Sequence, residues 1–283
     1  MTSNTSMPWR RLRLPGPWRR RTAGELPYRA AVAIGCRLDP TPLLFARRLR
    51  RLPAPSCLLA LVYTGRAPEA VRAMVNDAVA AGFDVRLWAL NDPDPELASL
   101  TVGTGVGGRL ELLNTLTQDR GKQWVVIADD DVAFRKGTIV DLVRVAAALK
   151  LDIVQPAHER GSFANHWITR RLPFQVARQT AFVECGPVVA FSPRAAEHAL
   201  PFPAYGMGWG LEFVWRALQE RGLRLGILDA VSIVHLFGAG RDYSRSVEGQ
   251  RLERLCSESG VTSLEEIQIT LRRFPPWTPI ARA

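Results

Sequence analysis

The sequence predicts an α/β protein built on a Rossmann-like mixed sheet that is flanked by helices. From residue 56 onward, apolar runs of strand length alternate with amphipathic segments of helical period, which is the pattern of a sheet covered by helices. A chain of 283 residues that is 47% hydrophobic can also bury the core that such a sheet needs. These two observations exclude a wholly disordered or fibrous protein.

The first strands and helices of this body follow one another closely. Leu58–Tyr63 is an apolar run of strand length, and a helix is predicted from Pro68 until Gly82. Val85–Leu90 is predicted as a second strand, and it ends in the carboxylate-rich turn 91–95. Strand, helix, strand and polar turn in this order are typical of a nucleotide-binding half-sheet.

A third strand of the half-sheet ends in three acidic residues. The glycine-rich loop Gly103–Gly108 is predicted to lead into a helix, and Trp124–Ala128 then forms the strand that runs into Asp129, Asp130 and Asp131. Adjacent carboxylates repel one another unless a cation neutralises them, and hard oxygen ligands suit Mg²⁺ or Mn²⁺. Asp129 and Asp131 can share one such ion. The alternatives are a capped helix start or a solvated acidic turn.

The second half of the body contains a candidate catalytic base. Gly186–Phe191 is predicted as a strand, and a helix is predicted to begin at Leu211 after the glycine-rich segment 206–210. Glu212 then lies in the first helical turn, where the helix dipole favours the carboxylate form. A general base needs an ionised group that substrate can reach. The alternative is a helix-terminal glutamate without a catalytic role.

The last predicted strand, Ala230–His235, ends in a histidine. An imidazole can complete an oxygen-rich Mn²⁺ site, so His235 is a candidate third ligand. A single histidine is more often structural, which is the alternative interpretation.

The net charge of +10 belongs to the N-terminal part of the chain. Residues 1–55 contain twelve arginines against Glu25 and Asp39, whereas residues 56–283 are neutral. A nucleic-acid partner is therefore not expected for the body. We interpret residues 1–55 as a basic extension whose residues 1–26 are flexible. A short basic helix within 40–55 either docks on an anionic membrane or packs on the body.

Cysteine usage and hydropathy restrict the cellular context. The four cysteines form no CxxC pair, and no apolar run reaches the ~18 residues of a membrane-spanning helix. The first 25 residues also lack the apolar stretch of a signal peptide. We therefore expect a cytoplasmic protein, with peripheral contact at the inner face of the membrane through the basic extension.

Taken in order, the acidic run, the segment Gly208–Glu212 and the strand ending at His235 resemble the GT-A fold glycosyltransferases, especially the inverting family-2-like group. The resemblance covers residues 57 to 236. It implies a glycosyltransferase domain over 56–240, with 241–283 as a C-terminal tail or helix packed on that domain. The family's Glu-Asp pair is replaced here by Leu211-Glu212, which makes the candidate base one methylene longer.

The resemblance also implies roles for individual residues. Asp129, Asp131 and His235 would hold Mn²⁺ or Mg²⁺, and Glu212 would be the catalytic base. The residues implied to contact the nucleoside-diphosphate sugar donor are Thr64, Asp92, Arg109 and Asp130.

The segment Gly161–Thr180 is a candidate acceptor or lid loop because its periodicity is weak and it lies between the two halves. Its candidate acceptor contacts, together with one residue of the glycine-rich segment, are Trp167, Arg170, Arg178 and Trp209. The alternative is an ordinary connection whose basic residues face water.

The expected activity is metal-dependent transfer of a sugar from a nucleoside-diphosphate sugar to a hydroxyl or amine of an acceptor, with inversion at the anomeric carbon. Two alternatives remain open. A metal-dependent nucleotidyltransferase would also place carboxylates beside a nucleotide, but it would need a glycine-rich loop directly after the first strand, where this chain has only Gly65. The second alternative is a non-catalytic protein that binds a nucleotide sugar.

Overall fold

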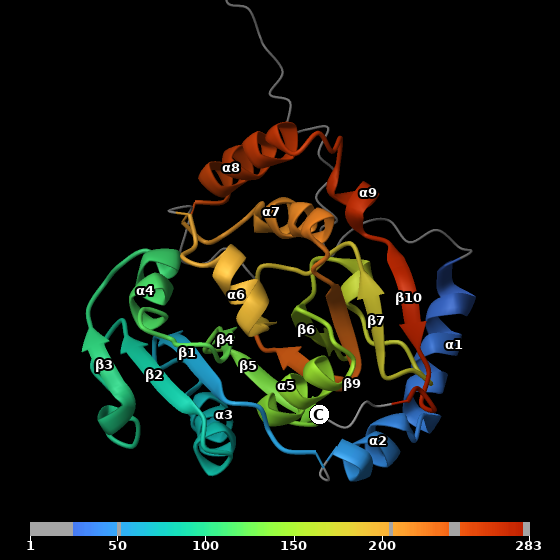
Figure 1. The fold of residues 1–283 in the computed structure, drawn as a ribbon, viewed down its shortest axis with the longest axis horizontal. Helices are drawn as coiled ribbons and strands as arrows, with labels where there is room; N and C mark the ends of the chain where they lie inside the picture. Colours follow the sequence, from blue (N-terminus) through green and yellow to red (C-terminus); the bar gives the residue numbers. More distant parts are fainter. Residues whose placement is uncertain (1–24, 50–51, 204–205, 238–243, 280–283) are drawn as a thin grey trace, which may run out of the picture.

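The computed structural model describes residues 25–49, 52–203, 206–237 and 244–279. Within them, ten strands form one mixed sheet in the order β10-β7-β9-β6-β8-β4-β1-β2-β3, with β5 paired to β9 (Figure 1). Residues 1–24 of the predicted flexible arm lie outside this description. The strands are β1 (Cys57–Tyr63), β2 (Asp84–Ala89), β3 (Thr101–Thr104), β4 (Trp124–Ala128), β5 (Val132–Lys136), β6 (Ile153–His158), β7 (Ala177–Thr180), β8 (Val188–Phe191), β9 (Leu225–His235) and β10 (Thr270–Phe274).

The predicted half-sheet is present. β1 pairs in parallel with both β2 and β4, and β2 pairs in parallel with β3. The glycine-rich loop begins later than predicted, because Gly103 belongs to β3. A Cβ at Gly103 would collide with the Trp88 ring, so only glycine lets β3 approach β2 this closely. Beyond β4 the sheet turns antiparallel through β8, which makes it mixed.

Helices cover both faces of the sheet. They are α1 (Glu25–Leu38), α2 (Thr41–Leu49), α3 (Pro68–Ala80), α4 (Arg109–Leu116), α5 (Ile139–Ala148), α6 (Pro193–Ala199), α7 (Leu211–Ala217), α8 (Arg245–Glu258) and α9 (Leu264–Ile267), with 3₁₀ turns at Ala98–Leu100, Trp167–Thr169 and Leu218–Arg221. The predicted fold class, a mixed α/β sheet flanked by helices, is confirmed.

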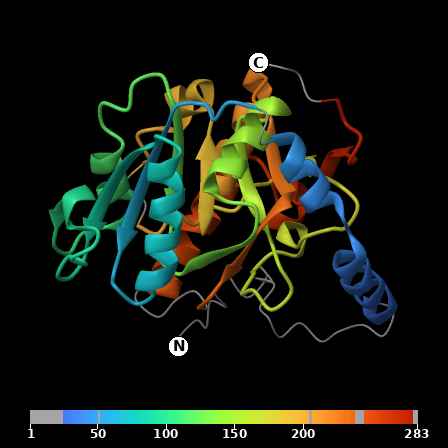
Figure 2. The same cartoon turned by 90° about the horizontal axis from the view of Figure 1, so that it is seen from below.

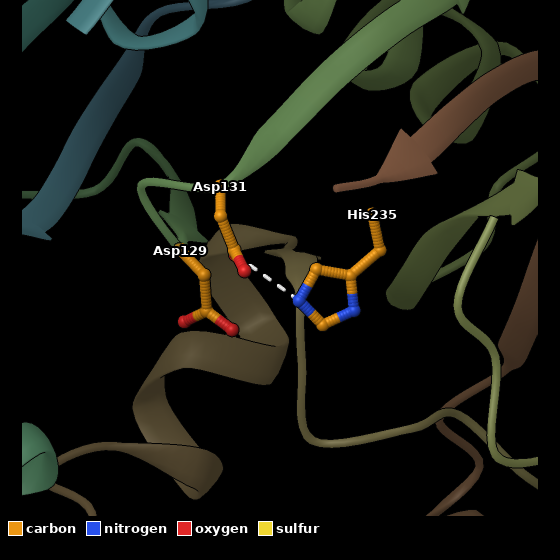
Figure 3. Close-up of side chains that lie close together, drawn as sticks. All are labelled: Asp129, Asp131 and His235. Atoms are coloured by element: carbon orange, nitrogen blue, oxygen red, sulfur yellow. Dashed lines mark ion pairs between the residues drawn. The ribbon is translucent and has the colours of Figure 1, made fainter. Parts of the chain in front are cut away.

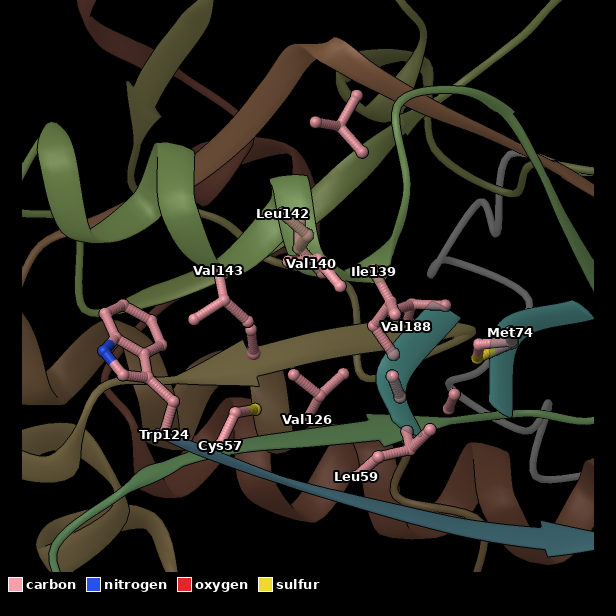
Figure 4. Packing of buried hydrophobic residues seen from close by; sticks show 14 of the residues in the cluster. Cys57, Leu59, Met74, Trp124, Val126, Ile139, Val140, Leu142, Val143 and Val188 are labelled. Atoms are coloured by element: carbon pink, nitrogen blue, oxygen red, sulfur yellow. The ribbon is translucent and has the colours of Figure 1, made fainter. Parts of the chain in front are cut away.

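Alternation along the central strands divides the core into two main layers. Leu59 of β1 and Val126 of β4 pack with α3 and α5, as Figure 4 shows. Their neighbours Ala60 and Val125 point to the other face and pack with α4, α6 and α7. Because β1 and β4 are buried on both faces, their sequences are continuous apolar runs, which is why they could be recognised as strands.

The described part of the basic extension packs on the body. α2 lies inside the predicted helix 40–55, and the apolar run Ala30–Cys36 belongs to α1. Asp39, between the two helices, forms a buried ion pair with Arg171 of the body. In Figure 2 both helices, in blue, lie on the outside of the molecule, away from the strands β1 to β3.

The C-terminal residues also belong to the fold. α8 and α9 pack beside α7 through a third apolar cluster, and β10 adds an edge strand antiparallel to β7. Among the described residues, no helix combines the length and apolarity required to span a bilayer.

Candidate functional site

The candidate metal ligands meet where β4 and β9 end. Asp129 and Asp131 follow the last residue of β4, and β5 begins directly after them. β5 pairs antiparallel with β9 in a register that places Val132 opposite His235. The backbone N–H of Leu236 donates to the Asp131 carbonyl at 2.9 Å, which closes this junction. Strand pairing therefore brings His235 to residues more than a hundred positions earlier in the chain.

Figure 3 shows the three side chains converging. The Nε2 atom of His235 lies 3.0 Å from Oδ1 of Asp131, and one potential ligand atom from each of Asp129, Asp131 and His235 lies within 4.8 Å of the others. All three residues are half-buried, so an ion could enter from solvent. Two carboxylates and one imidazole are ligands that Mn²⁺ accepts.

The charges of this cluster favour a cation. Burial alone would lower the pKa of His235, but the hydrogen bond and charge of Asp131, together with the charge of Asp129, outweigh burial and raise that pKa above its usual value. A proton on His235 thus compensates the carboxylates when no metal does. Metal binding has to displace this proton, because only neutral imidazole offers Nε2 as a ligand.

Asp129 is oriented by Arg109 from the start of α4. Nε and Nη2 of Arg109 donate to Oδ1 of Asp129 at 2.9 and 2.7 Å, while Nη1 donates to the Met207 carbonyl at 3.3 Å. On the other side, a Cβ at Gly186 would lie 3.1 Å from Oδ2 of Asp129. A larger residue at 186 would therefore crowd Oδ2 of Asp129, whereas the two bonds from Arg109 go to Oδ1. Glycine at 186 thus leaves room for Oδ2 to bind a metal ion, and the donors present fit such an ion.

Two of the predicted donor-binding residues contact each other. The backbone N–H and the hydroxyl of Thr64 both donate to Oδ2 of Asp130 at 2.6 Å, which ties the end of β1 to the acidic turn. Burial raises the pKa of Asp130, and the bonds from Thr64 counteract part of that rise. Asp92 is exposed after β2, whereas its neighbour Asn91 donates to the Thr64 carbonyl. The sequence did not indicate this contact of Asn91.

Glu212 lies in the first turn of α7, as predicted, but it is buried. Its Oε1 accepts the backbone N–H of Cys185 at 3.1 Å, and its Oε2 accepts that of Gly210 at 2.9 Å. Burial raises the pKa of Glu212, and these backbone bonds oppose the rise. Gly210 has φ +98°, a conformation that favours glycine and lets its N–H face the carboxylate. Because Cys185 precedes Gly186, the same short segment touches Glu212 and borders Asp129.

A second buried carboxyl group, Glu184, was missed. Asn165 donates to its Oε1 at 3.2 Å, and Nε2 of His158 and of His166 lie 3.7 and 3.9 Å from its oxygens. Burial raises the pKa of Glu184 to about 8 and lowers the pKa values of His158 and His166 to about 3 and about 4. The sequence feature that could have indicated a buried carboxyl group is the single acidic residue within the apolar run 181–185.

Glu184 predicts a pH dependence of stability. Its pKa is about 8 in the folded protein and near the ordinary 4.5 when unfolded. Between these values the unfolded chain releases the proton and the folded protein retains it, so the free energy of unfolding falls as pH rises. In metal-free buffer, Glu184→Gln should become more stable relative to the wild type across this range. Denaturant titrations at several pH values measure this; parallel curves would contradict it, and the exposed Glu220→Gln is the control.

The predicted acceptor segment Gly161–Thr180 is anchored to the body. It contains a 3₁₀ turn and β7, and its Arg178 side chain is only 2% exposed. Nε and Nη2 of Arg178 donate to the two carboxylate oxygens of Asp229, and Nη1 donates to the Ile168 carbonyl. Arg178 is a structural residue inside the protein, and neither of the two interpretations, an acceptor contact or a solvated side chain, holds for it.

The other three candidate acceptor residues lie nearer the surface. Trp167 is exposed, with the guanidinium of Arg29 4.6 Å from its ring centroid. Arg170 is partly buried and donates to the carbonyls of Glu159 and Ser162. Trp209 is partly buried against the apolar clusters around α7. Their role toward an acceptor stays a prediction.

Comparison with known proteins supports the architecture. No protein-family model matches the sequence, and no curated protein matches it either. A solved structure of GalNAc-T7 with UDP, GalNAc and Mn²⁺ is similar to this chain, with a TM-score of 0.51 and 10% sequence identity. The match covers 72% of this chain and 48% of GalNAc-T7, so the chain spans about half the length of that protein. At this identity the likeness establishes a shared GT-A type fold.

Proposed function

We propose that the protein is a metal-dependent glycosyltransferase that uses a nucleoside-diphosphate sugar as donor. The observation that carries this proposal is the convergence of Asp129, Asp131 and His235 at the ends of β4 and β9. In sheets of this type, ligands bind outside the carboxyl ends of the strands. The fold is shared with GalNAc-T7, whose structure contains UDP and Mn²⁺, and this supports the same class of donor.

The ligand set suits a diphosphate. Asp129, Asp131 and His235 would hold Mn²⁺ or Mg²⁺, which when bound neutralises the negative charge that develops on a departing nucleoside diphosphate. Arg109 keeps Asp129 in position and brings a permanent positive charge to the same place. Thr64, Asp130 and Asn91 would shape the nucleoside side of the site at the end of β1, with Asp92 exposed beside them.

We propose that Glu212 is the general base that removes the proton from the acceptor. The carboxylate is held by the backbone amides of Cys185 and Gly210, and the Cys185 thiol also hydrogen-bonds to it. Burial raises its pKa, which improves a carboxylate as a proton acceptor. Removal of the proton from an acceptor hydroxyl or amine would allow direct attack on the anomeric carbon. A single displacement of this kind inverts the configuration there, and NMR of the product tests that assignment.

Ligand-induced stabilisation tests the donor class. A ligand that binds the folded state raises the melting temperature, so UDP, GDP, ADP and dTDP can be compared with and without Mn²⁺. We expect one nucleoside diphosphate to stabilise the protein markedly more in the presence of Mn²⁺. Equal shifts in Mn²⁺ and in excess chelator, or no shift with any of the four, would contradict the proposal. Stabilisation without sugar transfer across a broad acceptor panel would favour a binding protein.

A further inference from the structure

Five large apolar side chains are exposed at the outer corner made by α1 and α2. Each is more than half exposed, and together we call them the apolar corner: Ile34, Leu38, Leu43, Leu44 and Phe174. Ile34 and Leu38 are one helical turn apart on α1, and Leu43 and Leu44 lie in the first turn of α2. Exposed apolar side chains that gather in one region mark interaction sites more often than singly scattered ones do.

The body fixes this corner in place. Asp39 joins the two helices: its Oδ1 accepts the Thr41 backbone N–H at 2.9 Å, and its Oδ2 pairs with buried Arg171. Arg171 in turn donates to the carbonyls of Cys36 and Asp229. The end of α1 and the start of α2 are therefore held against the sheet domain by a buried charge pair. Leu38 and Leu43, on either side of Asp39, remain exposed although Asp39 itself is buried.

Phe174 extends the corner from a different part of the chain. A Cβ at Gly35 would lie 3.5 Å from Cε2 of Phe174, so this ring adjoins α1 next to Ile34. Phe174 has φ +59°, a conformation that is costly for a bulky residue. The fold thus accepts backbone strain to hold an aromatic ring at the surface, and such strain is concentrated at functional positions.

The charge around the corner is positive. Arg37 and Arg48 are exposed on α1 and α2, and Arg48 also donates to the Pro276 carbonyl. Residues 1–55 contain twelve arginines and only two acids, and Asp39, one of those acids, is buried against Arg171. The carboxylate of Asp39 therefore does not offset the exposed guanidinium groups of Arg37 and Arg48.

We propose that the apolar corner docks on an anionic phospholipid bilayer. Leucine, isoleucine and phenylalanine side chains enter the boundary between headgroups and acyl chains, while neighbouring arginines bind lipid phosphates. Stable attachment to the bilayer requires both the apolar side chains and the arginines, because either kind alone gives weak and reversible binding. No residue of the apolar corner belongs to the metal cluster. The proposal does not depend on the proposed glycosyltransferase activity.

Vesicle sedimentation with the full-length protein tests the proposal. We expect binding to vesicles that contain phosphatidylglycerol, weaker binding to pure phosphatidylcholine, and loss of binding at high salt. Leu43→Ser combined with Phe174→Ser should reduce partitioning about tenfold or more, because two inserted side chains are lost while every arginine remains. Phe174→Leu, which keeps an apolar side chain, should bind nearly as the wild type does.

The control is Val79→Ser combined with Val247→Ser, which removes two comparably exposed apolar residues from α3 and α8. Its partitioning should equal that of the wild type. Unchanged binding of the Leu43/Phe174 variant would assign attachment to charge alone and overturn the proposal, as would absence of binding by the wild type. Circular dichroism of each variant verifies folding, which should be intact because all four positions are exposed.

Discussion

Asp131→Asn is expected to abolish Mn²⁺ binding at the cluster and to reduce sugar transfer by at least about 100-fold, since a metal ion supplies several kcal/mol of charge stabilisation to such a reaction. The substitution removes the carboxylate that lies 3.0 Å from Nε2 of His235. It leaves Asp129 and its two bonds to Arg109 in place. The expected loss is therefore specific to the metal and not to the shape of the acidic turn.

Two direct measurements separate metal loss from misfolding. Mn²⁺ affinity can be measured by electron paramagnetic resonance, where the variant should show the free ion at concentrations that saturate the wild type. NMR titration without metal should show a lower pKa for His235 in the variant, because burial then acts without its main opposing partner. Asp152→Asn is the matched control, since Asp152 precedes the amino end of β6, away from the carboxyl ends of the strands where the metal cluster lies, and it accepts hydrogen bonds from the Ser192 hydroxyl and the Arg224 backbone N–H. Wild-type Mn²⁺ affinity in Asp131→Asn would refute the ligand assignment.

The central sheet could be predicted because burial leaves a local signature. Trp124–Ala128 is apolar throughout since both of its faces are covered, and its predicted bounds equal those of β4. β5 has no such signature. Its residues 132–136 mix apolar and charged side chains, and the strand exists because it pairs with β9. That pairing sets the distance between Asp131 and His235, so the ligand set could be guessed from residue types while its geometry could not.

Two other side chains had surroundings that the sequence did not predict, because their partners lie in distant segments of the chain. Arg178 looked like an exposed basic residue because its partner, Asp229, lies fifty-one residues away. Glu184 was overlooked because its surroundings come from His158, Asn165 and His166, which are scattered along another segment. Local periodicity reports which face of an element is buried. It carries no information on which polar side chains will share that interior.

Glu212→Gln is expected to reduce sugar transfer by about 100-fold or more while donor binding persists, since a positioned general base contributes roughly 10²–10⁴-fold. The amide cannot take a proton from the acceptor. It can still accept one backbone N–H through its oxygen, but its NH₂ group faces the other N–H, so one of the bonds from Cys185 and Gly210 is lost. Some loss of stability should accompany the loss of rate.

A matched control separates loss of the general base from loss of support for the glycine-rich segment 206–210. Glu248 of α8 is also buried, and its carboxylate accepts the backbone N–H of Met207 from the same glycine-rich segment. Glu248→Gln should therefore lower the melting temperature to a similar degree but retain transfer. The pH profile at saturating Mn²⁺, where metal keeps His235 neutral, gives a second criterion. The limb of kcat/KM that rises with pH in the wild type should then be absent from Glu212→Gln, because it reports ionisation of the base. If both variants lost activity equally and kept the wild-type pH profile, Glu212 would be a support for the Cys185–Gly186 segment, and the base would have to lie elsewhere.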